Sequence, residues 1–163
     1  MARLKLCNKD NGPVRFLLEK SPFNDDDDDD DDACKSVDSK ECSAIGQIFP
    51  ISEMYKDAAY RIEIKLSTTY PLTPPEIKFL TPIYHPNVDP ESGVLCDASI
   101  LTTATYTPKM SLVDIIEAVI KCIDEPNCDK PVRAALGVEY VNDRATFIRN
   151  AQMEARKSGL PRT

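Results

Sequence analysis

The stretch that decides the fold is residues 60–66, with the sequence YRIEIKL. Apolar side chains alternate here with charged ones, which is the period of a strand with one buried and one wet face. Residues 34–37, 42–49 and 76–80 predict further strands, and Pro74-Pro75 marks a rigid turn before the last of these. Together they predict an antiparallel sheet.

The strongest helical pattern follows at residues 112–123, where apolar side chains recur on one face. Ser111 begins a capping-box pattern at the start of this helix, and Pro126 ends it. A further helical region runs from residue 132 to about residue 157, divided near residues 141–143. We interpret the apolar face of the first of these helices as core.

The N-terminal residues predict a short helix that begins near Pro13, because residues 15–20 favour a helix while residues 11–13 break any longer one. The order is then helix, antiparallel strands, an irregular segment and helices, which predicts an α+β fold. The length of 163 residues fits a single domain, 1–163, and 42% hydrophobic residues exclude disorder throughout.

Eight consecutive aspartates, Asp25–Asp32, account for the acidic balance of the chain. Without them the formal net charge changes from -7 to +1. We expect this run to form a disordered, solvated loop, with binding of a cation or a basic partner as the alternative. The sequence has no cluster of lysines and arginines that would bind the phosphate backbone of a nucleic acid, so nucleic acid is not expected as a partner.

The six cysteines are expected to be reduced thiols, because no secretory segment develops in the first residues. We expect the protein in the cytoplasm, the nucleus or both, and no membrane partner, since no apolar run is long enough to span a bilayer. No C-x-x-C pair occurs and His85 is the single histidine, so no metal site is predicted.

Residues 70–109 are expected to contain little regular structure beyond the strand at 76–80, because seven of these forty positions are prolines. Such a long irregular stretch, packed down by apolar residues, is typical of a functional site. It contains residues 70–75 (YPLTPP), residues 84–87 (YHPN) and a glycine three residues before Cys96. From about Ile45 to the C-terminus, these landmarks and the long helix after them resemble the ubiquitin-conjugating enzymes.

This resemblance implies a four-stranded antiparallel sheet with flanking helices, and Cys96 as the residue that accepts ubiquitin or a ubiquitin-like modifier as a thioester from an activating enzyme. A thiolate is a strong nucleophile near neutral pH and also leaves well. Asn87 resembles the family's Asn, which stabilises the oxyanion or braces the loop beside it. His85, Pro86 and Tyr106 are expected to support the site structurally. No bound cofactor is expected, because the activating enzyme uses the ATP.

The C-terminal part is most similar to the family branch that serves HECT and RING-between-RING ligases, a likeness carried by residues 60–64 and 133–151. In that family two loops face the ligase, and Lys109 places a charge where the family surface is usually apolar. The first helix, where relatives dock the activating enzyme, is interrupted here. The ligase-binding residues implied by the resemblance are Leu72, Thr107, Pro108 and Lys109.

Family members that transfer directly to lysine carry acidic residues near the thiol and in the loop after the long helix. Ala98 and Lys130 stand at the positions that align with these acids, and we name them the acceptor gate. Both acids are therefore absent and Lys130 would repel a lysine substrate, so we expect transfer to a ligase cysteine. Asp97, next to Cys96, disfavours the thiolate by like-charge repulsion, which would slow thiolate chemistry.

Two other functions remain open. A degenerate family member would bind ubiquitin or a ligase without catalysis, which Asp97, Lys109 and the interrupted first helix favour. An unrelated cysteine hydrolase would use Cys96 with His85, although His85 in this motif is more often structural than a base.

Overall fold

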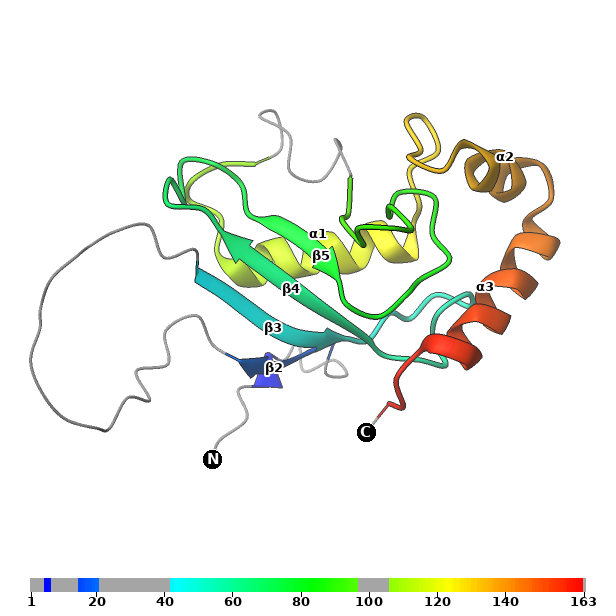
Figure 1. The fold of residues 1–163 in the computed structure, drawn as a ribbon, viewed down its shortest axis with the longest axis horizontal. Coiled ribbons are helices and arrows are strands. Elements are labelled where there is room, and N and C mark those ends of the chain that lie inside the picture. The colour runs from blue at the N-terminus through cyan, green and yellow to red at the C-terminus, as the bar shows by residue number, and fades with distance from the viewer. Residues whose placement is uncertain (1–4, 7–14, 21–41, 97–105, 163) are drawn as a thin grey trace, which may run out of the picture.

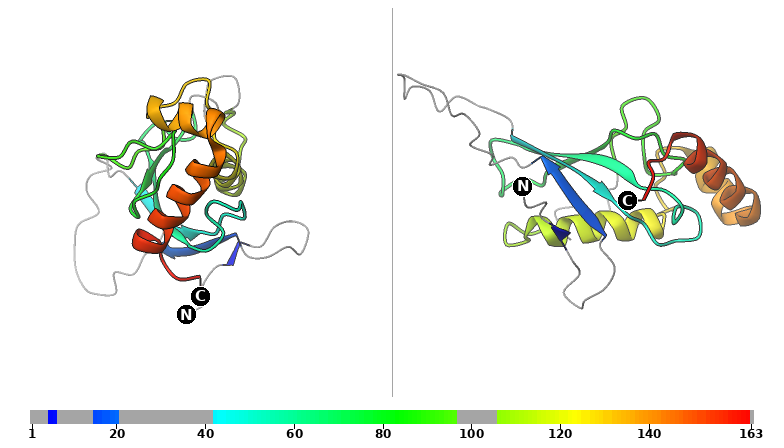
Figure 2. Two further views of the ribbon diagram at one scale, coloured as in Figure 1. Left: turned by 90° about the vertical axis from the view of Figure 1, so that its right-hand side faces the viewer. Right: turned by 90° about the horizontal axis from the view of Figure 1, so that it is seen from below.

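The protein, described by a computed structural model over residues 5–6, 15–20, 42–96 and 106–162, contains one antiparallel sheet and three helices (Figure 1). The strands follow one another in the sheet in chain order. Helix α1 lies along one face of the sheet, and α2 and α3 lie at one end (Figures 1 and 2). The strands are β1 Lys5–Leu6, β2 Phe16–Lys20, β3 Cys42–Ile48, β4 Tyr60–Leu66 and β5 Glu76–Phe79. The helices are α1 Leu112–Asp124, α2 Ala134–Asn142 and α3 Arg144–Ser158.

The α+β fold and its antiparallel sheet confirm the prediction. Strand β4 pairs with β3 along its whole length, from Ile48↔Tyr60 to Cys42↔Leu66. Its alternate residues from Tyr60 to Leu66 are buried, as the pattern of residues 60–66 predicts. Strands β2 to β5 form the expected four-stranded sheet, and the two-residue β1 extends it at one edge.

Helix α1 forms where the sequence predicts it. Ser111 and Asp114 form the capping box in both directions, since each side chain bonds the other's backbone N–H. The buried face of the helix joins the sheet in one apolar cluster that extends from Phe16 to Ala155. The buried residues of α1 are Ile115, Ile116, Val119, Ile120, Cys122 and Ile123.

The predicted N-terminal helix is wrong over residues 15–20, because Phe16–Lys20 forms strand β2. Phe16 is buried against Gly46 of β3, where a Cβ atom would collide with the Phe16 ring. This contact with a distant strand outweighs the local helix preference. The predicted strand at 34–37 and the acidic run at 25–32 lie outside the described residues.

Asp124, at the end of α1, ties the helix to two other parts of the fold. Its carboxylate accepts hydrogen bonds from the Arg15 guanidinium at 2.6 Å and from the backbone N–H groups of Ile51 and Ser52 at 3.0 and 2.8 Å. The carboxylate therefore fixes the turn between β3 and β4 against the helix. Among the described residues, no helix is both long and apolar enough to cross a membrane.

We predict that Asp124→Ala lowers the free energy of unfolding by about 2–4 kcal/mol, because two backbone donors and a guanidinium lose their charged acceptor. Urea denaturation followed by circular dichroism measures this change. The matched control is Asp57→Ala, which removes an exposed carboxylate and should change stability by less than about 0.5 kcal/mol. Equal effects of the two substitutions would contradict the role of Asp124.

Candidate functional site

Cys96 lies on the surface next to the 84–87 turn. Its backbone N–H donates to the Asn87 carbonyl oxygen at 3.0 Å, and its side chain is exposed. A turn at residues 89–93 makes this approach possible. There, Asp89 Oδ1 accepts from the backbone N–H of Ser92 at 2.7 Å, and Gly93 adopts a φ of 73° that favours glycine. The turn folds the chain back so that Cys96 lies beside Asn87.

The Asn87 side chain, although buried, bonds a distant loop. Its Nδ2 donates to the Asn127 carbonyl oxygen at 2.8 Å, and its Oδ1 accepts from the Asn127 backbone N–H at 3.0 Å. Because a backbone N–H can only donate, this pair also determines which way the amide is oriented. The loop at residues 125–131 is thereby held against the turn that carries Asn87. Of the two roles expected for Asn87, the geometry supports that of a brace.

His85 and Pro86 belong to the interior of the same turn. The His85 ring is fully buried, and its Nδ1 accepts the Asn87 backbone N–H at 3.1 Å. The Pro86 carbonyl oxygen accepts the Arg133 N–H at 3.0 Å at the start of α2. A buried imidazole whose Nδ1 is already bonded to the turn is poorly suited to act as a base for the exposed Cys96 thiol.

A polar network that sequence reasoning did not assign to the site links this turn to the C-terminal helices. The Tyr84 hydroxyl donates to Glu139 Oε2 of α2 at 2.6 Å, and Asn150 Nδ2 of α3 donates to Glu139 Oε1 at 2.7 Å. Burial, followed by the hydrogen bond to Glu139, raises the pKa of Tyr84. Glu139 and Asn150 lie within residues 133–151, which carry the resemblance to the family branch. Nothing in their spacing, however, indicates that Tyr84, 55 residues before Glu139, is a partner.

The ligase-binding residues of the sequence prediction come together on the surface. The buried Tyr106 donates its hydroxyl to the Pro71 carbonyl oxygen at 2.7 Å, so the segment before α1 lies beside the β4–β5 turn (Figure 1). Burial raises the pKa of Tyr106. Leu72 in that turn is 76% exposed. Thr107, Pro108 and Lys109 are also exposed.

The acceptor gate is described only in part. Lys130 is exposed in the loop that Asn87 braces. Ala98 and Asp97 lie outside the described residues, so their expected effects stay predictions. In the same loop Cys128 is half-buried, and burial followed by the charge of Asp129 raises its pKa. Of the four cysteines that the structure describes, only Cys96 is exposed.

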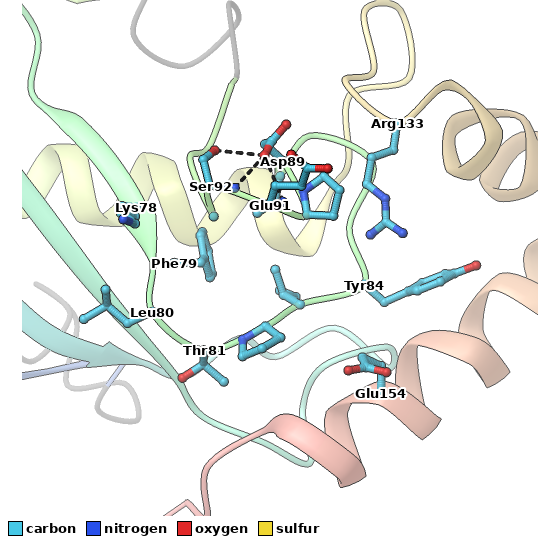
Figure 3. Close-up of a pocket in the computed structure, with 15 residues that line it drawn as sticks. Lys78, Phe79, Leu80, Thr81, Tyr84, Asp89, Glu91, Ser92, Arg133 and Glu154 are labelled. Carbon is cyan, nitrogen blue, oxygen red and sulfur yellow. Dashed lines mark hydrogen bonds between the residues drawn. The ribbon is translucent and has the colours of Figure 1, made fainter.

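A pocket of about 620 Å³ is lined by residues 78–84 and 88–93 together with Arg133 and Glu154 (Figure 3). Tyr84 and Arg133 form one wall, Glu154 lies below them, and the 89–93 turn lies above. Cys96 does not line this pocket. Within the described part of the chain, no three His, Cys, Asp or Glu side chains are placed to hold a metal ion.

Comparison with known proteins gives one consistent result. A family model described as "Ubiquitin-conjugating enzyme" matches residues 22–155. The chain is 31% identical over 131 residues to the ubiquitin-conjugating enzyme E2-18 kDa of Drosophila melanogaster, covering 78% of this chain and 84% of that one. It is 34% identical over 111 residues to the ubiquitin-conjugating enzyme E2 14 of Schizosaccharomyces pombe, covering 68% of each. The crystal structure of a putative ubiquitin conjugating enzyme from Plasmodium yoelii matches with a TM-score of 0.65 and 23% identity, over 74% of this chain and 77% of that one, which supports the fold.

We predict that Asn87→Ala lowers the free energy of unfolding by about 2–3 kcal/mol, because it leaves two backbone groups of Asn127 unpaired. Chemical denaturation measures the loss. Asn127→Ala is a matched control, since the bonds to Asn87 use only the backbone of Asn127 and survive the change. This control loses the bond from the Asp129 N–H to Asn127 Oδ1 and should cost about 1 kcal/mol or less. An equal or larger loss in Asn127→Ala would contradict the brace.

Proposed function

This chain belongs to the ubiquitin-conjugating enzyme family and is a ubiquitin-conjugating transferase, and we propose that Cys96 carries the modifier as a thioester on its way from an activating enzyme to a ligase cysteine. Family membership implies ubiquitin, an activating enzyme and a ligase as partners in general. The observation that carries the residue assignment is the exposure of Cys96 beside the braced Asn87 turn.

Loading is an exchange of one thioester for another. The Cys96 thiolate attacks the carbonyl carbon of the modifier's C-terminal thioester, a new C–S bond forms, and the thiolate of the activating enzyme leaves. ATP is used earlier, by the activating enzyme, so no cofactor is needed on this chain. Ubiquitin and a ubiquitin-like modifier remain alternative cargoes for the same step.

Asn87 supports this reaction by positioning the groups around the thiol. Its side-chain amide uses Oδ1 and one Nδ2 hydrogen to hold the 125–131 loop, and its carbonyl oxygen accepts the Cys96 N–H. An amide nitrogen carries two hydrogens, so a second donor is available for the oxyanion of the tetrahedral intermediate. The two roles expected for Asn87 are therefore compatible.

The acceptor is proposed to be a ligase cysteine. Lys130 is exposed in the braced loop. It stands at the position that aligns with an acid of family members that transfer to lysine, so its positive charge would repel an incoming lysine. A thiol needs no carboxylate to become a nucleophile near neutral pH, whereas a lysine with a pKa of about 10.4 does. The ligase class is proposed to be HECT or RING-between-RING, docked at Leu72 and residues 107–109.

The proposed setting is the cytoplasm, the nucleus or both, where thiols stay reduced. A second candidate is a family member that binds ubiquitin or a ligase without catalysis. The observation in its favour is strand β2, which occupies residues 16–20 where a first helix was expected as the docking site for the activating enzyme. Loading assays separate the two candidates.

We predict that Cys96 forms the only reductant-sensitive adduct with ubiquitin or a ubiquitin-like modifier when the chain is incubated with activating enzyme and ATP. Non-reducing gel electrophoresis detects it. Cys96→Ala should abolish the adduct, Cys96→Ser should give at most an ester that resists reductant, and the control Cys128→Ala should still be loaded. A Cys96→Ala protein that is still loaded would refute the assignment, and a wild-type protein that no modifier loads would favour the binding-only candidate.

Discharge of the loaded protein tests the acceptor. We expect rapid discharge onto free cysteine and slow discharge onto free lysine, because Lys130 repels the ammonium group. Lys130→Asp should raise the lysine rate about threefold or more, and Lys56→Asp, the same charge change at another exposed site, should not. Comparable wild-type rates onto lysine and cysteine would contradict the proposal.

A further inference from the structure

Three hydroxyl groups form a closed ring in the β4–β5 turn. Ser67 Oγ lies 3.0 Å from Thr69 Oγ1 and 2.7 Å from Thr73 Oγ1, and the two threonine hydroxyls lie 2.7 Å apart. Each hydroxyl can donate one hydrogen bond and accept two. Three donors therefore suffice for the three contacts, and the ring joins the two ends of the turn.

The ring links the side chains of residues 67, 69 and 73, and the backbone of Leu72 lies within this segment. The Leu72 N–H donates to the Thr69 carbonyl oxygen at 2.8 Å, and the Thr73 N–H approaches the same oxygen at 3.3 Å. The Pro71 carbonyl oxygen accepts the Tyr106 hydroxyl. The residues before, at and after Leu72 are thus each held by a separate hydrogen bond, although the Leu72 side chain itself is 76% exposed.

An exposed leucine on a fixed backbone is suited to binding. Association costs conformational entropy when a loop must be ordered, and a residue that is already held in place avoids part of that cost. Binding energy at interfaces is concentrated in a few side chains that fill well-packed, desolvated pockets of the partner. Lys109 is exposed on the neighbouring segment, which the Tyr106 bond brings beside the turn.

We propose that the hydroxyl ring of Ser67, Thr69 and Thr73 is a positioning device that presents Leu72 to a ligase. The ligase surface that fits has an apolar recess for Leu72 and a carboxylate for Lys109. This inference rests on the proposed function, because it assumes that the ligase docks at Leu72. It adds the three hydroxyl residues, which are themselves exposed, as determinants of ligase recognition that act by holding the Leu72 backbone.

The test uses the full-length protein loaded with the modifier, and HECT and RING-between-RING catalytic domains as probes. The measured quantity is the ratio of ligase-stimulated discharge to discharge onto free cysteine, so that effects on Cys96 chemistry cancel. Thr73→Val removes one hydroxyl from the ring, and Ser67→Ala breaks it from the other side. Thr73→Ser keeps the hydroxyl, and Thr68→Val changes an exposed threonine of the same turn that is not in the ring.

We expect Thr73→Val and Ser67→Ala to lower this ratio about fivefold, while Thr73→Ser and Thr68→Val keep the wild-type ratio. The Leu72 amide should also exchange hydrogen faster in the two ring-breaking variants. If a ligase stimulates the wild type but Thr73→Val behaves like Thr68→Val, or Thr73→Ser behaves like Thr73→Val, the inference is overturned and the proposed function stands. If neither ligase class stimulates the loaded wild type, transfer to a ligase cysteine is overturned, and this inference with it.

Discussion

The site depends on the pair of hydrogen bonds between the Asn87 amide and the backbone of Asn127. Asn87 also receives the Cys96 N–H at its carbonyl oxygen and donates its own N–H to His85. One buried residue therefore joins the segment that bears the thiol, the 84–87 turn and the 125–131 loop. A shift in any of these three segments would strain bonds to the other two, so the thiol and the loop keep a constant geometry.

The surface around Leu72 is held by different contacts. Its backbone is positioned by the Tyr106 hydroxyl and by the hydroxyl ring of the β4–β5 turn, and none of these bonds involves Asn87 or the 125–131 loop. Changes at Leu72 or Lys109, the proposed ligase-binding residues, are therefore expected to leave the geometry at Cys96 unchanged. This separation suits an enzyme whose chemistry is constant and whose partners differ.

Periodic patterns predicted much of the fold. The spacing of apolar residues within strand β4 and within helix α1 is enough to show which side chains of each element are buried. The N-terminal helix was mispredicted because the contact of Phe16 with Gly46 depends on a strand 30 residues away. In the site, Cys96 and Asn87 could be named from motif resemblance. The partner of Asn87 could not, since Asn127 lies 40 residues further along the chain and contributes only backbone atoms, which carry no sequence signal.

The most direct test of the brace is hydrogen exchange at the backbone amide of Asn127 in the unmodified protein, read by NMR. That N–H donates to a buried side chain, so we predict exchange at least about tenfold slower than in an unstructured peptide. Exchange at the rate of an unstructured peptide would contradict the brace, because the loop would then be free of Asn87.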